Sequence, residues 1–141
     1  MSEIKVDTLK GKTSAGDVDI TSEGGAVTMQ LQQGLAKTWV NLNGNGTIAI
    51  RDSLNVASLT DEGTGAYQTN LTTNMGNSNY AVTGSAGDSG GATGCWHTTG
   101  FNLNGYNTGN QTGSFHAQIY YATNQIADID FVYSALHGDL A

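Results

Sequence analysis

The sequence is poor in charge, and especially in positive charge. Charged residues make up 12% of the chain, about half of the usual quarter, which excludes a charge-rich disordered tail. The net charge is −7, and the five basic residues stand singly, so no positive cluster exists to bind phosphates or anionic lipids. We therefore expect neither nucleic acid nor a membrane surface as a partner.

Cysteine and long apolar runs are also scarce. The single cysteine, Cys95, excludes an intrachain disulfide framework and fits synthesis in a reducing cytoplasm. The N-terminal residues lack the basic and apolar regions of an export signal, and no apolar run is long enough to span a membrane. The expectation is a chain made in the cytoplasm, without a signal peptide and without membrane insertion.

What the chain does have is two-residue alternation of apolar side chains, with glycines between the alternating stretches. This pattern predicts short strands in an N-terminal arm at residues 1–37. So short an arm buries too little surface to be stable alone, so we expect it to assemble with identical arms in a homo-oligomer. The residues that form these arm strands are Ile4, Val6, Val18, Ile20, Val27, Met29 and Leu31.

Residues 38–141 continue the alternation and predict the main domain. Asn-Gly and Gly-rich turns separate the strands, which favours tight antiparallel hairpins. We therefore predict an all-β fold, with an antiparallel sandwich or jelly-roll-like body. The strands are expected at 39–42, 47–50, 55–60, 66–71, 79–84 and 115–121, with a last strand that places Ile129, Phe131, Tyr133 and Ala135 on its core face and Asp128 and Asp130 on the other.

Residues 85–114 are mostly Gly, Ser, Thr and Asn and predict a long loop. Isolated large side chains stand in it, namely Trp96, His97, Phe101 and Tyr106. Aromatic residues among small polar ones are typical of adaptable protein-binding and saccharide-binding surfaces. These residues are the candidate ligand contacts, and the alternative is that they anchor the loop on the body.

Catalytic motifs are present only in part. Gly87-Asp88-Ser89-Gly90-Gly91 matches the nucleophile region of chymotrypsin-like proteases, but no histidine precedes Ser89 as that family requires. A polysaccharide-cleaving enzyme would need two carboxylates about 5–10 Å apart in a cleft. The carboxylates available for such a pair are Asp52, Asp61, Glu62, Asp128 and Asp130. We do not expect an enzyme.

A metal or another cofactor is not expected either. Cys95 and His97 stand close together, but the sequence offers no second cysteine to complete a tetrahedral zinc set. The carboxylate pairs in the chain are not followed by a calcium-binding loop with a terminal glutamate. A metal on the symmetry axis of an oligomer stays open.

Two stretches resemble known proteins. The opening, MSEIKVDTL through TMQLQQGLAK, is similar to the N-terminus of small virion proteins of marine bacteriophages. WVNLNG, followed by IAIRDSLNV and NYAV, resembles a module of phage tail-fibre and other appendage proteins. Together the two resemblances cover roughly residues 1–86.

The resemblance implies a homotrimeric, β-rich structural protein located on the virion. It would be a tail fibre or tail-associated appendage that binds a host-surface glycan or protein, and its arm would contact other virion proteins. The alternative is a capsid-decoration or head-fibre protein that stabilises the shell. The resemblance transfers no catalytic residues.

Overall fold

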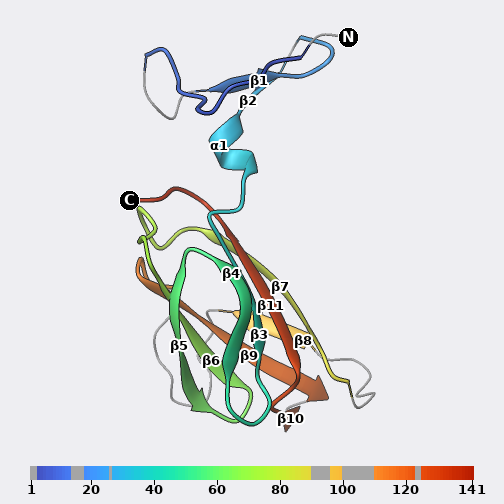
Figure 1. Ribbon diagram of the computed structural model, residues 1–141. Coiled ribbons are helices and arrows are strands. Elements are labelled where there is room, and N and C mark those ends of the chain that lie inside the picture. The colour runs from blue at the N-terminus through green and yellow to red at the C-terminus, as the bar shows by residue number, and fades with distance from the viewer. Residues whose placement is uncertain (1–2, 14–17, 26, 90–95, 100–109, 123–124) are drawn as a thin grey trace. The chain divides into compact units, whose positions relative to one another are not determined.

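The computed structural model describes residues 3–13, 18–25, 27–89, 96–99, 110–122 and 125–141 (Figure 1). The chain divides into two compact units, of which one ends at Leu35 and the other runs from Ala36 to Ala141. We call these units the arm and the body. The division falls close to residue 37, where the sequence places the end of the arm.

The arm contains a β-hairpin and a single helical turn. β1 (Asp19–Thr21) pairs antiparallel with β2 (Thr28–Gln30), and α1 (Leu31–Gly34) follows directly. Ile20 lies opposite Met29, so their side chains share one face of the hairpin, whereas Thr21 and Thr28 share the other face. The strands expected around Ile20 and Met29 are therefore confirmed.

The strand expected at Ile4 and Val6 is not formed. Residues 3–13 carry no strand, and within the described parts of the arm only β1 and β2 pair. Two apolar side chains at two-residue spacing favour extended backbone, but a strand also needs a hydrogen-bonded neighbour. Among the described residues of a single copy, this segment has no such neighbour.

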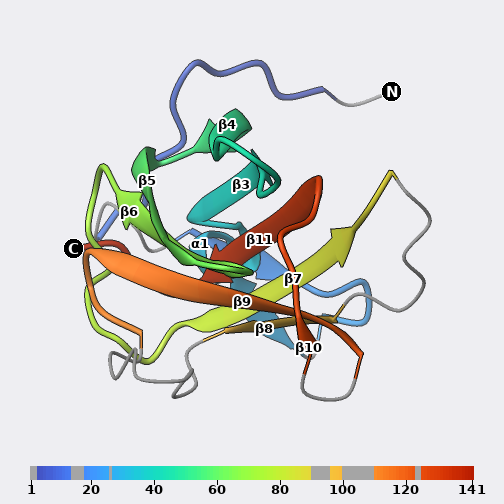
Figure 2. The same cartoon turned by 90° about the horizontal axis from the view of Figure 1, so that it is seen from below.

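The body consists of two antiparallel sheets, seen as separate layers in Figure 2. The first, which we call the β3–β11 sheet, has the order β4 (Ala49–Leu54), β3 (Thr38–Asn43), β11 (Phe131–His137) and β7 (Ala81–Gly87). The second, the β6–β9 sheet, has the order β10 (Gln125–Ile126), β9 (Ser114–Ala122), β6 (Ala66–Leu71) and β5 (Val56–Gly63), with β8 (Trp96–Thr99) also paired to β9.

The strand order pairs the two ends of the body with each other. β3 and β11, the first and last strands of the body, pair with each other, and β7 pairs with the other edge of β11. In the opposite layer β6 and β8 both pair with β9. Antiparallel pairing of strands far apart in sequence is typical of β-sandwiches. The predicted all-β sandwich is confirmed.

The core lies between the two sheets. It is formed by every second side chain of the strands, as the alternation in the sequence predicts. Every second residue of β3, namely Thr38, Val40 and Leu42, is buried, and the residues between them are half-buried. β9 likewise buries Phe115 and Ile119, which are both fully covered. Alternating side chains point to opposite faces of a strand, so each of these strands covers the core with one face.

Ile129 is buried as expected, but within β11 the core face is the opposite of the one expected. Val132, Ser134 and Leu136 face the core, and Tyr133 is 40% exposed on the outer face. Both faces of β11 carry apolar side chains, so alternation alone could not choose between them. Pairing with β3 decides the orientation, because it sets Ser134 opposite the buried Val40.

The segment 85–114 is not a loop throughout. β7 extends to Gly87, and β8 occupies residues 96–99 within the segment. β8 aligns Trp96 with Tyr120 and Thr99 with Ala117 of β9. The segment is rich in Gly, Ser and Thr, so local propensity does not predict a strand there. β8 forms because it pairs with β9.

A hydrogen-bonded cluster closes one end of the sandwich. The buried Tyr67 hydroxyl donates to the Gly44 carbonyl at 2.8 Å and lies 3.3 Å from Asp128 Oδ1. The same carboxylate accepts the Gly65 amide at 2.7 Å. Burial, and then the charge of Asp128, raise the pKa of Tyr67 well above its usual range. The hydroxyl therefore stays a donor and joins β6 to the β3–β4 turn.

Tyr67→Phe is expected to lower the free energy of unfolding by about 1–3 kcal/mol, because it leaves the buried Gly44 carbonyl without its donor. Urea unfolding followed by fluorescence measures the loss. A matched control is Tyr120→Phe in the same sheet, which removes a hydroxyl that donates to Gln118 at 2.7 Å. Equal unfolding curves for Tyr67→Phe and the wild type would contradict the role of the cluster.

Candidate functional site

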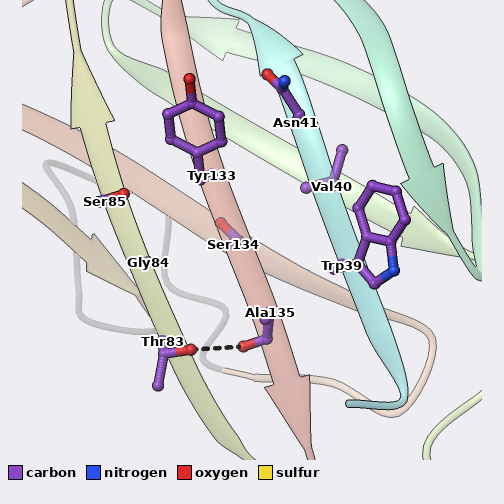
Figure 3. A pocket seen from close by; sticks show the side chains of 9 residues that line it. All are labelled: Trp39, Val40, Asn41, Thr83, Gly84, Ser85, Tyr133, Ser134 and Ala135. Atoms are coloured by element: carbon purple, nitrogen blue, oxygen red, sulfur yellow. Dashed lines mark hydrogen bonds between the residues drawn. The ribbon is translucent and has the colours of Figure 1, made fainter.

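An open hollow lies on the outer face of the β3–β11 sheet, with a volume of about 510 Å³. Residues of β3, β11 and β7 line it, as Figure 3 shows. Since these three strands are paired side by side, their outward side chains are held in rows across the sheet. The lining residues are Trp39, Val40, Asn41, Thr83, Gly84, Ser85, Tyr133, Ser134 and Ala135.

Two rows of cross-strand neighbours form the surface of the hollow. In one row Ala135 lies between Trp39 and Thr83, and in the other Tyr133 lies between Asn41 and Ser85. Figure 3 shows the Trp39 indole and the Tyr133 ring on the same side of the sheet. The lining carries no charged side chain. The hollow therefore combines two aromatic rings with amide and hydroxyl groups.

The Tyr133 ring belongs to a short aromatic stack. Its centroid lies 6.3 Å from that of Phe131, with the two rings within 5° of parallel. The Arg51 guanidinium lies 4.4 Å from the Phe131 centroid and donates to the Leu42 carbonyl at 2.9 Å. A cation over an aromatic ring is attracted by the ring quadrupole. These contacts hold the outer face of β11 in one arrangement.

One polar atom of the lining has no partner. Asn41 Oδ1 is buried, and among the described residues no donor reaches it. An unpaired buried amide oxygen costs about 1–3 kcal/mol. Such an atom indicates a position where a donor from a bound molecule could fit.

The outer face of the β6–β9 sheet is different in character, since its polar side chains are paired with one another. Asn70 Nδ2 donates to Ser58 at 3.1 Å and to Thr60 at 3.2 Å. His116 Nδ1 and Glu62 Oε2 lie 2.8 Å apart. Within the described body, the exposed large apolar side chains lie elsewhere, and they are Ile50, Leu54, Tyr133 and Leu140.

The candidate ligand residues of the sequence lie largely outside the described parts. Trp96 and His97 belong to β8, opposite Tyr120 and Ile119 of β9, but their side chains are not among those described. Phe101 and Tyr106 lie wholly outside the described residues. A contact role for all four stays a prediction.

The arm residues expected to mediate assembly are exposed in a single copy. No described residue of the arm is buried, and Ile4 is 87% exposed. Val18 and Leu31 are half-buried. The exposed arm residues of the predicted set are Ile4, Val6, Ile20, Val27 and Met29.

The protease-like motif makes a structural contact. The Ser89 amide donates to Asp130 Oδ2 at 3.1 Å, and its hydroxyl also donates to that oxygen. Asn45 Nδ2 donates to Asp130 Oδ1 at 3.1 Å. Asp130 therefore joins the end of β7 to the β3–β4 turn instead of projecting from the last strand.

These donors lower the pKa of Asp130 from 3.8 to about 2, the Ser89 hydroxyl most of all. A carboxylate with a lowered folded-state pKa stabilises the fold above its unfolded pKa, and this contribution is lost as the pH falls. We expect the contribution to be complete above pH 3.8 and to disappear as the pH falls towards 2. NMR titration of the Asp130 carboxyl carbon measures the pKa, and in Ser89→Ala it should move back towards 3.8. An unchanged midpoint in Ser89→Ala would contradict the assignment.

No family model, curated protein or solved structure matches the chain. In the described parts, no three His, Cys, Asp or Glu side chains gather closely enough to hold a metal ion. Nor does any described helix have the length and apolar character needed to cross a membrane.

Sequence reasoning missed the hollow. The sequence predicts strands at Trp39 and Tyr133, but their shared outer face depends on the pairing of β3 with β11, whose residues are far apart in sequence. One local signal was present, since Val40 and Leu42 alternate with Trp39 and Asn41. If the first pair faces the core, the second must face outward.

Proposed function

We propose that this chain is a homotrimeric structural protein of a bacteriophage virion, a tail fibre or tail-associated appendage that takes part in binding the host surface. The arm carries this proposal, because none of its described residues is buried and most of its large apolar residues are exposed. The resemblance of residues 1–86 to phage virion and appendage proteins supports the same conclusion.

The exposed arm favours assembly on physical grounds. Ile20, Val27 and Met29 are each at least half exposed, at 50%, 64% and 59%. Burying apolar surface contributes roughly 25 cal/mol per Å², whereas ordering the backbone costs roughly 1–2 kcal/mol per residue. A hairpin without a core does not offset that cost alone. Packing against identical arms supplies the missing apolar contacts and the missing strand neighbours.

Binding of the host would be multivalent. Three weak sites on one trimer, and many trimers on one particle, raise the avidity by about 10²–10⁴ without a tight single site. The contact residues we assign to this role are Trp96, His97, Phe101 and Tyr106. Their mixture of aromatic rings with small polar neighbours suits a glycan or an adaptable protein surface.

Electron cryomicroscopy of the particle that contains this chain tests the proposal. We expect a threefold density of about 44 kDa, three copies of the 14.6 kDa chain, on the tail or a fibre. Density on the capsid lattice would instead assign the chain as a decoration protein that stabilises the shell. A particle without such density in either place would overturn both assignments.

A further inference from the structure

We propose that a second copy of this chain docks on the outer face of the β3–β11 sheet, at the hollow between Trp39 and Tyr133. This inference rests on the homo-oligomer of the proposed function and names the surface of the body that takes part in it. We call this surface the β3–β11 face. It consists of the hollow together with the exposed Leu54, which lies opposite Trp39 at the β4 edge.

The distribution of charge favours a second copy. Every copy has a net charge of −7, so two copies repel unless they meet where charge is absent. The hollow is such a place, because none of its lining residues is charged. Two charged side chains border it on the neighbouring strand β4: Asp52 lies opposite Asn41, and the Arg51 guanidinium lies over the Phe131 ring.

The apolar character of the face favours a protein surface as its occupant. Tyr133 is 40% exposed and Leu54 is 47% exposed. Trp39 lies between them, opposite Leu54 on β4 and opposite Ala135, two residues after Tyr133, on β11. Aromatic side chains are enriched at the centres of protein interfaces, where charged side chains are depleted. The outer face of the β6–β9 sheet lacks this character in its described part, since its side chains form hydrogen bonds with one another.

The polar groups of the face include both donors and an acceptor. Asn41 Oδ1 is a buried acceptor without a donor among the described residues, and hydroxyl groups of Thr83, Ser85 and Tyr133 surround the same hollow. A copy that presents its own hydroxyl groups would bring donors to this acceptor. In a trimer the contact is heterologous, so one part of this face can meet a different part in the next copy.

Chain connectivity is consistent with this arrangement. Only Ala36 and Lys37 separate the end of the arm from β3. Each residue spans at most about 3.6 Å, so assembled arms would bring the β3 strands of different copies near one another. β3 is also the strand that contributes Trp39 and Asn41 to the face.

The test uses the full chain and the variant Ser85→Arg. Ser85 is exposed, so the substitution is compatible with folding, and it changes the net charge from −7 to −6. Long-range repulsion between copies therefore falls. If association still weakens, the cause is the arginine side chain, which blocks the β3–β11 face. The control is Thr60→Arg, which makes the same charge change at an exposed position of β5.

Sedimentation over a range of concentrations gives the dissociation constant of each form. We expect Ser85→Arg to raise it by about tenfold or more, and Thr60→Arg to leave it unchanged. Thr83→Arg, on the same strand, serves as the second variant if circular dichroism shows that Ser85→Arg does not fold.

The outcomes separate this inference from the proposed function. If the wild type assembles and both arginine variants assemble equally well, this face is not the interface and assembly through the arms stands. A wild type that stays monomeric would overturn the homo-oligomer itself. If Ser85→Arg leaves assembly unchanged but abolishes binding to purified host-envelope glycan, the hollow belongs to a saccharide and our assignment is wrong.

Discussion

Replacing Ile20 and Met29 together by aspartate is expected to convert the assembled chain into a monomer. The two side chains lie opposite each other on one face of the arm hairpin and are 50% and 59% exposed. In an assembly of arms they would pack against other copies, and burying unpaired carboxylates there costs several kcal/mol. Sedimentation equilibrium should show the mass fall from about 44 kDa to 14.6 kDa.

The hairpin offers a matched control. Thr21 and Thr28 also lie opposite each other, but on the other face. Aspartates at these two positions add the same charge to the same strands. The control should therefore keep the assembled mass, and loss of assembly in both double variants would show that charge alone, and not the apolar face, is responsible.

Gly65→Ala is expected to destabilise the body by about 3 kcal/mol. Gly65 has a φ of +64°, in the left-handed region that favours glycine. An added Cβ would lie 2.8 Å from the Ala127 carbonyl oxygen and 3.1 Å from the Ile119 carbonyl oxygen, both on the backbone. Neither neighbour can rotate away, so steric repulsion adds to the strain of the positive φ.

Gly46→Ala separates the two effects. Gly46 has nearly the same φ, +68°, but an added Cβ would have nothing within 4 Å. We expect a loss of about 1–2 kcal/mol there, from backbone strain alone. Chemical denaturation of both variants gives the comparison. If they lose the same stability, the close packing of the β5–β6 turn against the segment around Ala127 does not contribute.

Much of the fold could be predicted from the sequence because several strands alternate cleanly. In β9 the apolar Phe115 and Ile119 alternate with polar neighbours, so the core face is clear from the sequence. β11 is apolar on both faces, and only its pairing with β3 selects Val132 and Leu136 for the core. Local alternation carries no information about such long-range pairing.

The candidate site was harder to predict for the same reason. The β3–β11 face joins Trp39 of the first body strand to Tyr133 of the last, and no spacing in the sequence links them. The aromatic residues of the segment 85–114 are easier to recognise as candidates, because each is surrounded in sequence by small residues. Trp39 lies within an ordinary strand, and nothing in the residues around it indicates that it belongs to a site.

The most direct test of the central claim, that this chain works by assembling, is the mass of the full-length protein in solution at micromolar concentration. The account predicts about 44 kDa by sedimentation equilibrium, three times the 14.6 kDa of one chain. A folded species of 14.6 kDa, with arm amides protected from hydrogen exchange, would contradict it.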